Sequence, residues 1–347
     1  MSLEDILKER IKNEGPISIA HFMAEALSHP EHGYYMTKDP FGKEGDFITA
    51  PEISQMFGEL IGIWCLLLWE KMGKPNNLHI VECGPGRGTL MKDFFNGTKN
   101  IKGFHASINP HLVETSGKLQ KIQKNTLKGT HNNINWHNDL SFLPDAPTIF
   151  IANELFDALP FHQFVMTEKG WQEQLVGVTS NNEFEFCLSD DIKTIAEQHN
   201  GAKIGSIIET CPTGSDIADK MAKQIKQHGG GAVIIDYGYD EYGYKDTLQA
   251  VKNHEYHNIL QDVGDADITA HVDFINLANI FTSNGLFCKT TTQRDFLLSL
   301  GIEQRYMSLM KEASQEQQKE LTSATGRLIN PDKMGTLFKV ITTEYIK

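Results

Sequence analysis

A short apolar run that ends in a carboxylate and then breaks into three spaced glycines restricts the fold of this chain most. It reads HIVECGPGRGTLM from His79 to Met91, with Glu82 two residues before Gly84 and further glycines at positions 86 and 88. An uninterrupted apolar run indicates a buried parallel strand, and the glycines indicate a tight turn into the following helix. The pattern predicts the first strand–turn–helix unit of a nucleotide-binding sheet.

Strand and helix patterns then alternate along most of the chain. The sequence predicts strands at 78–83, 108–114, 134–139, 147–153, 232–238 and 335–345, and helices at 88–95, 116–125, 213–228, 271–283 and 294–315. This alternation predicts an α/β fold, a doubly wound and mostly parallel sheet whose ligands bind at the carboxyl ends of the strands.

Two segments depart from this pattern. Residues 1–74 hold two short helices broken at Gly15 and Pro16, a glycine-rich aromatic loop at 33–52, and a largely buried helix opened by Pro51. Residues 161–188 alternate polar and apolar side chains, which predicts an antiparallel hairpin. We therefore expect N-terminal helices and a lid loop at 1–74, a core at 75–160 and 229–347, and an insertion with a β-hairpin and helices at 161–228.

The excess of acidic over basic residues narrows the classes of molecule that the protein could bind. The 347 residues include 45 Asp and Glu against 32 Lys and Arg, a formal net charge of −13. Proteins whose main task is nucleic-acid binding neutralise phosphates with Lys and Arg, so this balance argues against nucleic acid. An acidic surface suits a basic polypeptide.

Cysteine usage and hydropathy suggest where the protein works. The five cysteines are scattered and form no C-x-x-C pair, which predicts reduced thiols and neither a disulfide frame nor a metal site. The first 15 residues mix both charge signs and match neither a signal nor a transit peptide, so we expect a bacterial cytoplasmic protein. The most apolar run, 60–69, is too short to cross a bilayer, and no membrane insertion is expected.

The glycine loop suggests a specific cofactor. A dinucleotide fingerprint needs glycine at the sixth position of its motif, where this chain has Thr89. S-adenosylmethionine carries an ammonium and a sulfonium and no phosphate, so Glu82 at the strand end would hold its amino acid moiety. Gly84, Gly86 and Gly88 would let the backbone approach it closely. A tight turn that binds no ligand is the alternative.

Acids at the ends of the next strands support a cofactor site. Glu114 ends the second strand, where an acid accepts the ribose hydroxyls in doubly wound folds. Asp139 ends the third strand and would reach the adenine amino group. Either acid alone could be a solvated residue after a strand, but together with Glu82 they predict an S-adenosylmethionine site. Asn153, which ends the fourth strand, is placed on the same cofactor side.

The fourth strand runs into the segment ANELFDALP, which brings Glu154 and Asp157 to the mouth of the site. Enzymes that methylate neutral amide or amino nitrogens tend to place Asn or Asp before two prolines and an aromatic residue there, and this chain has no such proline pair. Paired carboxylates are the natural clamp for a guanidinium, which is always protonated and offers five donors. The alternative is that Glu154 caps a helix and Asp157 bonds its neighbours.

Two further segments contribute candidates. In the loop at 33–52, Tyr34 and Phe47 would exclude water, and Asp46 would meet the cofactor or a basic acceptor. The alternative is that the tyrosines only pack the N-terminal helices over the sheet. In ADITAHVDF, His271 is a candidate proton acceptor, with a purely structural role as the alternative, and Asp267 matches the pattern of a helix N-cap. Asp236 ends another strand and has no definite role.

Several motifs together resemble the MidA family of class I methyltransferases. They are, in order, ISIAHFMAEALSHPEHGYY, GDFITAPEISQMFGELIG, ECGPGRGTLM, LVETS, ANELFDALP, IIDYG and ADITAHVDF. The resemblance runs through nearly the whole chain and implies a Rossmann-like fold, S-adenosylmethionine as cofactor, and methylation of an arginine on a quinone-module subunit of respiratory complex I. The eukaryotic members are mitochondrial assembly factors. Cys83 stands where the family suggests an aliphatic residue.

Three interpretations remain open from the sequence. The chain is a protein arginine methyltransferase with a protein substrate, a methyltransferase of a small molecule, or a non-catalytic assembly factor that keeps the cofactor fold. A dinucleotide dehydrogenase is less consistent with the glycine spacing. The protein is expected to be a monomer or a homodimer.

Overall fold

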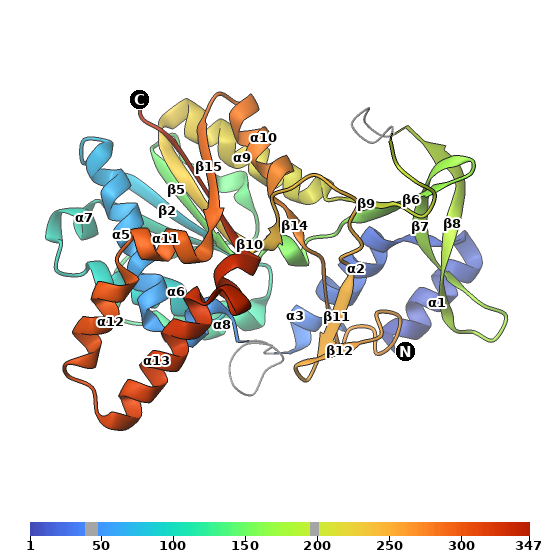
Figure 1. Cartoon of the computed structure of the whole chain (residues 1–347), viewed down its shortest axis with the longest axis horizontal. Helices are drawn as coiled ribbons and strands as arrows, with labels where there is room; N and C mark the ends of the chain where they lie inside the picture. The colour runs from blue at the N-terminus through green and yellow to red at the C-terminus, as the bar shows by residue number, and fades with distance from the viewer. Residues whose placement is uncertain (39–47, 195–200) are drawn as a thin grey trace. The chain divides into compact units, whose positions relative to one another are not determined.

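A computed structural model describes residues 1–38, 48–194 and 201–347 of the chain (Figure 1). The chain divides into two compact units. Unit 1 comprises Met1–Pro40, Asp157–Asp216 and Glu241–His271, and unit 2 comprises Phe41–Phe156, Ile217–Asp240 and Val272–Lys347. The division expected from the sequence, into residues 1–74, 75–160 with 229–347, and 161–228, remains a prediction.

Unit 2 contains a mostly parallel sheet of the predicted kind. Its strand order is β15-β16-β10-β5-β2-β3-β4, with β14 paired to β10. The strands are β2 (Leu78–Cys83), β3 (Ile108–Val113), β4 (Asn135–His137), β5 (Thr148–Asn153), β10 (Gly230–Tyr239), β14 (Val272–Asp273), β15 (Phe287–Thr292) and β16 (Phe338–Tyr345). Strand β16 runs antiparallel to β10 and β15, whereas the pairs from β10 to β4 are parallel. The predicted α/β class is confirmed.

The order of the strands fixes where a ligand can bind. Strand β2 pairs with β3 on one side and with β5 on the other, so the chain order reverses at β2. Because Cys83 lies opposite Ala152 in the sheet, the loops that follow β2 and β5 leave the same edge side by side. Open α/β sheets bind ligands at this switch point.

Helices cover both faces of the sheet of unit 2 (Figure 1). The helices of unit 2 are α4 (Ala50–Ile53), α5 (Gln55–Lys71), α6 (Thr89–Thr98), α7 (Lys102–Ser107), α8 (Gly117–Thr126), α10 (Phe274–Ser283), α11 (Gln293–Ser299), α12 (Ile302–Met310) and α13 (Gln315–Ile329). The long helix α9 (Pro212–His228) begins in unit 1 and continues into unit 2. Apolar side chains of α5 and α6 pack with those of β2 and β5 in one core, as the three- and four-residue spacing of α5 predicts.

Several elements differ from the sequence predictions. The single helix expected at 294–315 is wrong: Gly301, at a φ of +87°, ends α11 and starts α12, and α13 follows as a third helix. Asp267 is not a helix N-cap, because it lies in strand β13; Asp273 caps α10 through the backbone N–H groups of Ile275 and Asn276. The extra helix α7 explains the long spacing between the glycines and Glu114.

Unit 1 is built from helices and antiparallel strands. Its helices are α1 (Leu3–Glu14), α2 (Ile19–Ser28) and α3 (Tyr34–Thr37), and its strands are β1 (Ile17–Ser18), β6 (His162–Thr167), β7 (Gly170–Val178), β8 (Phe184–Lys193), β9 (Ile207–Thr210), β11 (Gln249–Lys252), β12 (Glu255–His257) and β13 (Asp267–Thr269). Strand β7 pairs antiparallel with β6 on one side and with β8 on the other, so the predicted hairpin is confirmed. Strands β12, β11 and β13 form a separate antiparallel sheet.

The core of unit 1 lies under its N-terminal helices. Apolar side chains of α1 and α2 pack with Tyr34, Phe161, Val176 and Ile268. Among the residues that the structure describes, no helix has the length and apolar character needed to cross a membrane.

Candidate active site

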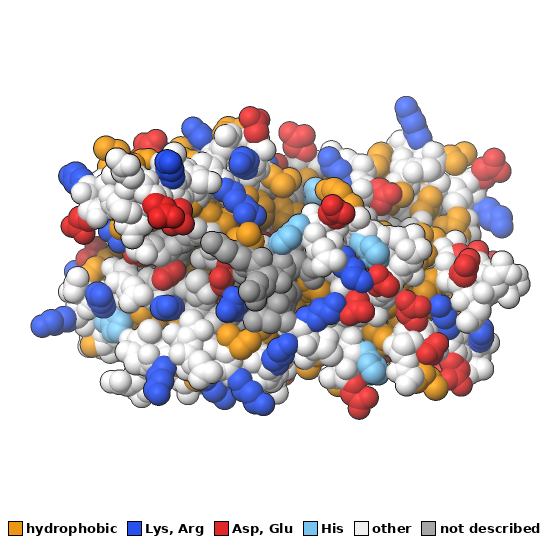
Figure 2. Space-filling view, turned by 90° about the horizontal axis from the view of Figure 1, so that it is seen from below, with side chains coloured by type: hydrophobic (Ala, Val, Ile, Leu, Met, Phe, Trp, Pro, Cys, Tyr) orange, Lys and Arg blue, Asp and Glu red, His pale blue; other side chains and the backbone are white. Residues whose placement is uncertain are grey.

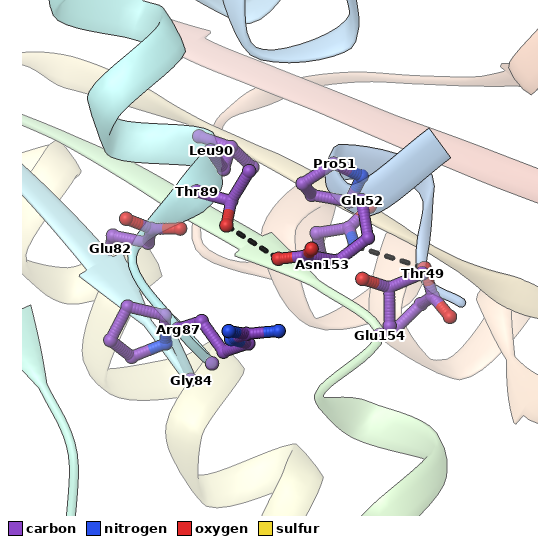
Figure 3. Close-up of a pocket in the computed structure, with 12 residues that line it drawn as sticks. Thr49, Pro51, Glu52, Glu82, Gly84, Arg87, Thr89, Leu90, Asn153 and Glu154 are labelled. Carbon is purple, nitrogen blue, oxygen red and sulfur yellow. Dashed lines mark hydrogen bonds between the residues drawn. The ribbon is translucent and has the colours of Figure 1, made fainter. Parts of the chain in front are cut away.

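A pocket of about 400 Å³, including its opening, lies at the switch point of unit 2 (Figure 3). It is lined by Thr49, Pro51, Glu52, Glu82, Gly84, Pro85, Gly86, Arg87, Thr89, Leu90, Asn153 and Glu154. The lining comes from the start of α4, the loop between β2 and α6, and the end of β5. Five of the residues predicted for the site therefore meet here, namely Glu82, Gly84, Gly86, Asn153 and Glu154.

Glu82 supplies a buried carboxylate to this pocket. It is 3% exposed, and its Oε2 atom has no hydrogen-bond partner among the described residues. Burial raises the pKa of Glu82 to about 8. A buried carboxylate without a donor is costly in free energy, so Glu82 suits a ligand that brings a positively charged donor.

The glycine loop has the geometry that its spacing predicts. Gly84 adopts a φ of +67°, and a Cβ atom there would lie 2.9 Å from Cδ1 of Leu155. Gly88, at a φ of +81°, is the N-cap of α6. These left-handed conformations favour glycine, and they turn the chain sharply from β2 into α6.

Asn153 and Glu154 form the opposite wall. Glu154 has a φ of +50°, which is uncommon for a residue other than glycine and is typical of functional sites. Its Oε1 atom accepts hydrogen bonds from the backbone N–H of Ala50, at 3.0 Å, and from Nδ2 of Asn153, at 3.2 Å. Oδ1 of Asn153 is buried and has no hydrogen-bond partner among the described residues. Two acceptors without donors, on Glu82 and Asn153, thus belong to one pocket.

The hydrogen bond from the backbone N–H of Ala50 also concerns the alternative in which Glu154 caps a helix. Ala50 is the first residue of α4, whose N-cap Thr49 makes no side-chain hydrogen bond to the helix. Glu154 therefore does satisfy a helix N-terminus, although that helix lies about a hundred residues earlier in the chain. Since Glu154 lines the pocket as well, capping and ligand binding are compatible.

Glu114 lies beyond the lining of this pocket but is linked to it. It directly follows β3, is 8% exposed, and accepts hydrogen bonds from the backbone N–H of Ser116 and from Nε2 of Gln123. Burial raises its pKa, and these hydrogen bonds oppose the rise. Nε2 of Gln123 also donates to the carbonyl of Gly86 at 2.8 Å, so a single buried amide connects the glycine loop to Glu114.

Asp139 and Asp236 make local contacts. The exposed side chain of Asp139 caps a short 3-10 turn through the N–H of Ser141, and these hydrogen bonds lower its pKa. The buried carboxylate of Asp236, in β10, accepts the backbone N–H of Phe156 at 3.0 Å and fastens the segment that follows β5. A contact of Asp139 with adenine stays a prediction.

The other predicted residues belong to unit 1 or lie outside the described residues. Asp157 is buried in unit 1. Burial, and after it the carboxylates of Asp267 and Asp157, raise the pKa of the partly buried Tyr35. Tyr34 is fully buried in the core of unit 1, as the packing alternative predicts. His271 lines a different cavity, formed by unit 1. Asp46 and Phe47 lie outside the described residues.

Sequence reasoning missed Glu52, Arg87 and Thr89. The hydroxyl of Thr89 donates to the carboxylate of Glu52, which joins the start of α6 to α4 (Figure 3). Arg87 is the one basic residue among the described residues that line the pocket. Its place inside the GPGRG loop was the signal that could have identified it.

The pocket fits S-adenosylmethionine in its donors and acceptors. The α-ammonium of that cofactor carries donors that Oε2 of Glu82 and Oδ1 of Asn153 lack, and its α-carboxylate is matched by the guanidinium of Arg87. The glycine loop leaves room beside the strand end without Cβ atoms. No group of three or more His, Cys, Asp or Glu among the described residues could hold a metal ion.

The chain is similar to known proteins over nearly its whole length. A model of S-adenosyl-L-methionine-dependent methyltransferases matches residues 60–292. The protein arginine methyltransferase NDUFAF7 of Danio rerio is 39% identical, with 96% of this chain and 84% of that protein covered. NDUFAF7 of Homo sapiens is 36% identical, with 96% and 81% covered, and both relatives are named mitochondrial.

A solved structure agrees with these sequence relatives. The crystal structure of a protein from Burkholderia thailandensis, bound to S-adenosyl-homocysteine, superposes with a TM-score of 0.87. The two chains are 25% identical, and 99% of this chain and 92% of that one are covered. This chain therefore belongs to the MidA family of class I methyltransferases, which use S-adenosylmethionine as their cofactor.

Proposed function

We propose that this protein transfers the methyl group of S-adenosylmethionine to an arginine side chain of a protein. The observation that carries the proposal is Glu154, a carboxylate held at a φ of +50° in the wall of the cofactor pocket. The name of the relatives, protein arginine methyltransferase, supports the same acceptor.

On the cofactor side, each candidate has a chemical task. Glu82 and Asn153 would accept hydrogen bonds from the α-ammonium, and Arg87 would pair with the α-carboxylate. Glu114 would accept the ribose hydroxyls, and Asp139 would meet the adenine amino group. The bound cofactor supplies an electrophilic methyl group on a sulfonium.

On the acceptor side, Glu154 would hold the guanidinium. A carboxylate that accepts two N–H groups of the guanidinium fixes its plane and attracts its positive charge, which leaves more electron density on the attacking nitrogen. The new bond joins that nitrogen to the methyl carbon, the carbon–sulfur bond breaks, and the nitrogen then loses a proton. Asp157 as the second carboxylate and His271 as the proton acceptor stay predictions.

The proposal extends to the target and its setting. The family resemblance implies a quinone-module subunit of respiratory complex I as the acceptor, and the sequence pattern predicts a bacterial cytoplasmic member. A water-excluding role for Tyr34, Asp46 and Phe47 belongs to the same proposal.

Two isosteric variants test the division between cofactor and acceptor groups. Glu82→Gln is expected to weaken S-adenosylmethionine binding about tenfold or more, because it removes the charge that faces the ammonium. Glu154→Gln keeps an oxygen for the N–H of Ala50, so cofactor affinity is expected to stay within about twofold while methyl transfer falls about 100-fold. Calorimetry and transfer of label from tritiated cofactor measure the two effects.

The label-transfer assay also identifies the protein that accepts the methyl group. A lysate of cells that lack the gene is incubated with labelled cofactor and the wild-type protein, and the labelled band is hydrolysed and analysed for methylarginine. A band that Glu154→Gln does not label supports the proposal. Cofactor binding without any labelled protein would instead favour a small-molecule acceptor or a non-catalytic role.

A further inference from the structure

Unit 1 contains a cavity of its own, of about 680 Å³ including open space. It is formed by the small antiparallel sheet and the segments that flank it. Leu248 and Ile259 give it apolar walls, and Asp246, Tyr256 and His271 give it polar and aromatic ones. We call this cavity the β11 groove. None of its lining residues belongs to the lining of the cofactor pocket.

A hydrogen-bond network holds the polar wall of the β11 groove in place. Behind the wall, Glu209 accepts the backbone N–H of Thr247 at 2.8 Å and its hydroxyl at 2.6 Å. Nε2 of Gln163 donates to Glu209 at 2.8 Å and to Asp246 at 3.0 Å. The hydroxyl of Thr247 accepts the backbone N–H of His271 at 2.9 Å. Asp246 is thus held by Gln163 and the backbone of His271 by Thr247, and Glu209 links these two residues.

The side chains that line the groove are of the types that bind a cationic group. Asp246 is an exposed acidic residue, and Tyr256 is 84% exposed. Burial, and then the charge of Lys245, lower the pKa of His271, which favours the neutral imidazole. A guanidinium or ammonium group bonds to a carboxylate and a neutral imidazole, and it stacks on an aromatic face.

The negative charge of the whole protein belongs to this unit. Unit 1 contains 23 Asp and Glu against 9 Lys and Arg, a net charge of −14, whereas unit 2 contains 22 against 23, a net charge of +1. Asp and Glu side chains are spread over the visible surface of unit 1 (Figure 2). A field of one sign raises the local concentration of oppositely charged partners and speeds their association.

We propose that the β11 groove docks a lysine- and arginine-bearing segment of the protein acceptor, so that unit 1 selects the substrate by charge. The inference rests on the proposed function, because it takes the acceptor to be a protein. Unit 2 then supplies the cofactor, and the groove supplies affinity for the basic sequence around the target.

Peptide binding tests the groove without methyl transfer. The probe is a fluorescein-labelled decapeptide of alternating glycine and arginine, and its counterpart has glutamine in place of arginine. Fluorescence anisotropy with the full chain is expected to show binding of the arginine peptide only. The double variant Asp246→Asn/Tyr256→Ser should weaken it about tenfold, since each contact contributes a few-fold.

The control changes the same residue types elsewhere in unit 1. Asp190 and Tyr242 are exposed and do not line the groove, so Asp190→Asn/Tyr242→Ser has the same charge and aromatic content as the groove variant. It should bind the arginine peptide like the wild type. Equal losses in the two double variants, binding of the glutamine peptide, or no binding of the arginine peptide by the wild type would each overturn the proposal.

Failure of the groove can be told apart from failure of the proposed function. Cofactor affinity of both double variants is measured by calorimetry and should equal that of the wild type. If the wild type methylates no arginine of any protein, the proposed function fails whatever the peptide shows. If it does methylate arginine and the groove variant keeps the wild-type KM for that acceptor, the groove proposal fails alone.

Discussion

At the scale of single residues, the site is a set of acceptors that need positively charged donors. Glu82 and Asn153 each have a buried oxygen without a hydrogen-bond partner among the described residues, and Glu154 is held in a left-handed conformation beside them. Proteins rarely leave such groups buried without a functional reason, because an unpaired buried oxygen costs about 1–3 kcal/mol. The cost is offset when a cationic ligand binds.

The raised pKa of Glu82 predicts a proton released on cofactor binding. Between pH 4.5 and 8 the folded, unliganded protein holds a proton that the unfolded chain has lost, so Glu82 makes the free energy of unfolding fall as pH rises through this window. In the proposed complex the cofactor ammonium faces Glu82, and its positive charge favours the ionised carboxylate. At pH 7, binding should therefore release close to one proton.

Calorimetry in two buffers that differ in ionisation enthalpy, phosphate and Tris, measures this proton. The wild type should show the release, and Glu82→Gln should show none. An equal proton count in the two proteins would mean that another group titrates on binding.

Most of these residues could be predicted from the sequence, but not all. Glu82 and the glycines stand in one local pattern, so their proximity follows from the chain itself. Glu52 and Glu154 reach the same pocket from positions about a hundred residues apart. Nothing local in the sequence places α4 over the end of β5, so Glu52 was missed.

At the scale of elements, α8 connects the segments that follow β2 and β3. Gln123 is fully buried on the inner face of this helix and bonds the glycine loop, Glu114 and the indole N–H of Trp136. One side chain thus fixes three elements. A glutamine on the apolar face of a helix was the sequence signal for this role.

Gln123→Met should destabilise the fold and weaken cofactor binding. Methionine has a similar volume but makes none of these hydrogen bonds, so we expect a loss of about 2–4 kcal/mol in the free energy of unfolding. Cofactor affinity should fall about tenfold as the glycine loop loosens. Urea denaturation and calorimetry measure the two effects. Lys121→Met, an exposed position on the same helix, serves as control. Unchanged stability in Gln123→Met would show that this network contributes little.

The elements that were predicted wrongly share a cause. The helix expected at 294–315 has continuous apolar spacing, yet Gly301 takes a left-handed conformation and divides it. Asp267 followed by Thr269 matches an N-cap pattern, but pairing of β13 with β11 places it in a strand. In both cases a tertiary contact or a turn overrode the local pattern.

At the scale of the whole molecule, charge separates the two units. Unit 1 has a net charge of −14 and unit 2 has one of +1. Like charges on one compact body repel and destabilise it, and salt screens that repulsion. The sequence as a whole has a net charge of −13, and only the assignment of residues to units shows where the charge lies.

Salt should therefore stabilise unit 1 and not unit 2. Raising NaCl from 20 to 200 mM is expected to slow backbone hydrogen exchange in peptides from unit 1, with little change in peptides from unit 2. Exchange followed by mass spectrometry measures both units in one sample, and sucrose at equal osmolality controls for non-ionic effects. Equal responses in the two units would contradict the prediction.

The sequence by itself determined the class of sheet, the glycine loop and the family, because strand and helix periods and glycine spacing are local properties of the chain. Only the tertiary structure decided that Glu52 and Glu154 face one pocket, that Asp236 fastens a neighbouring segment, and that three separate stretches form the acidic unit 1. Such contacts join residues far apart in sequence, and they depend on packing that no local pattern records.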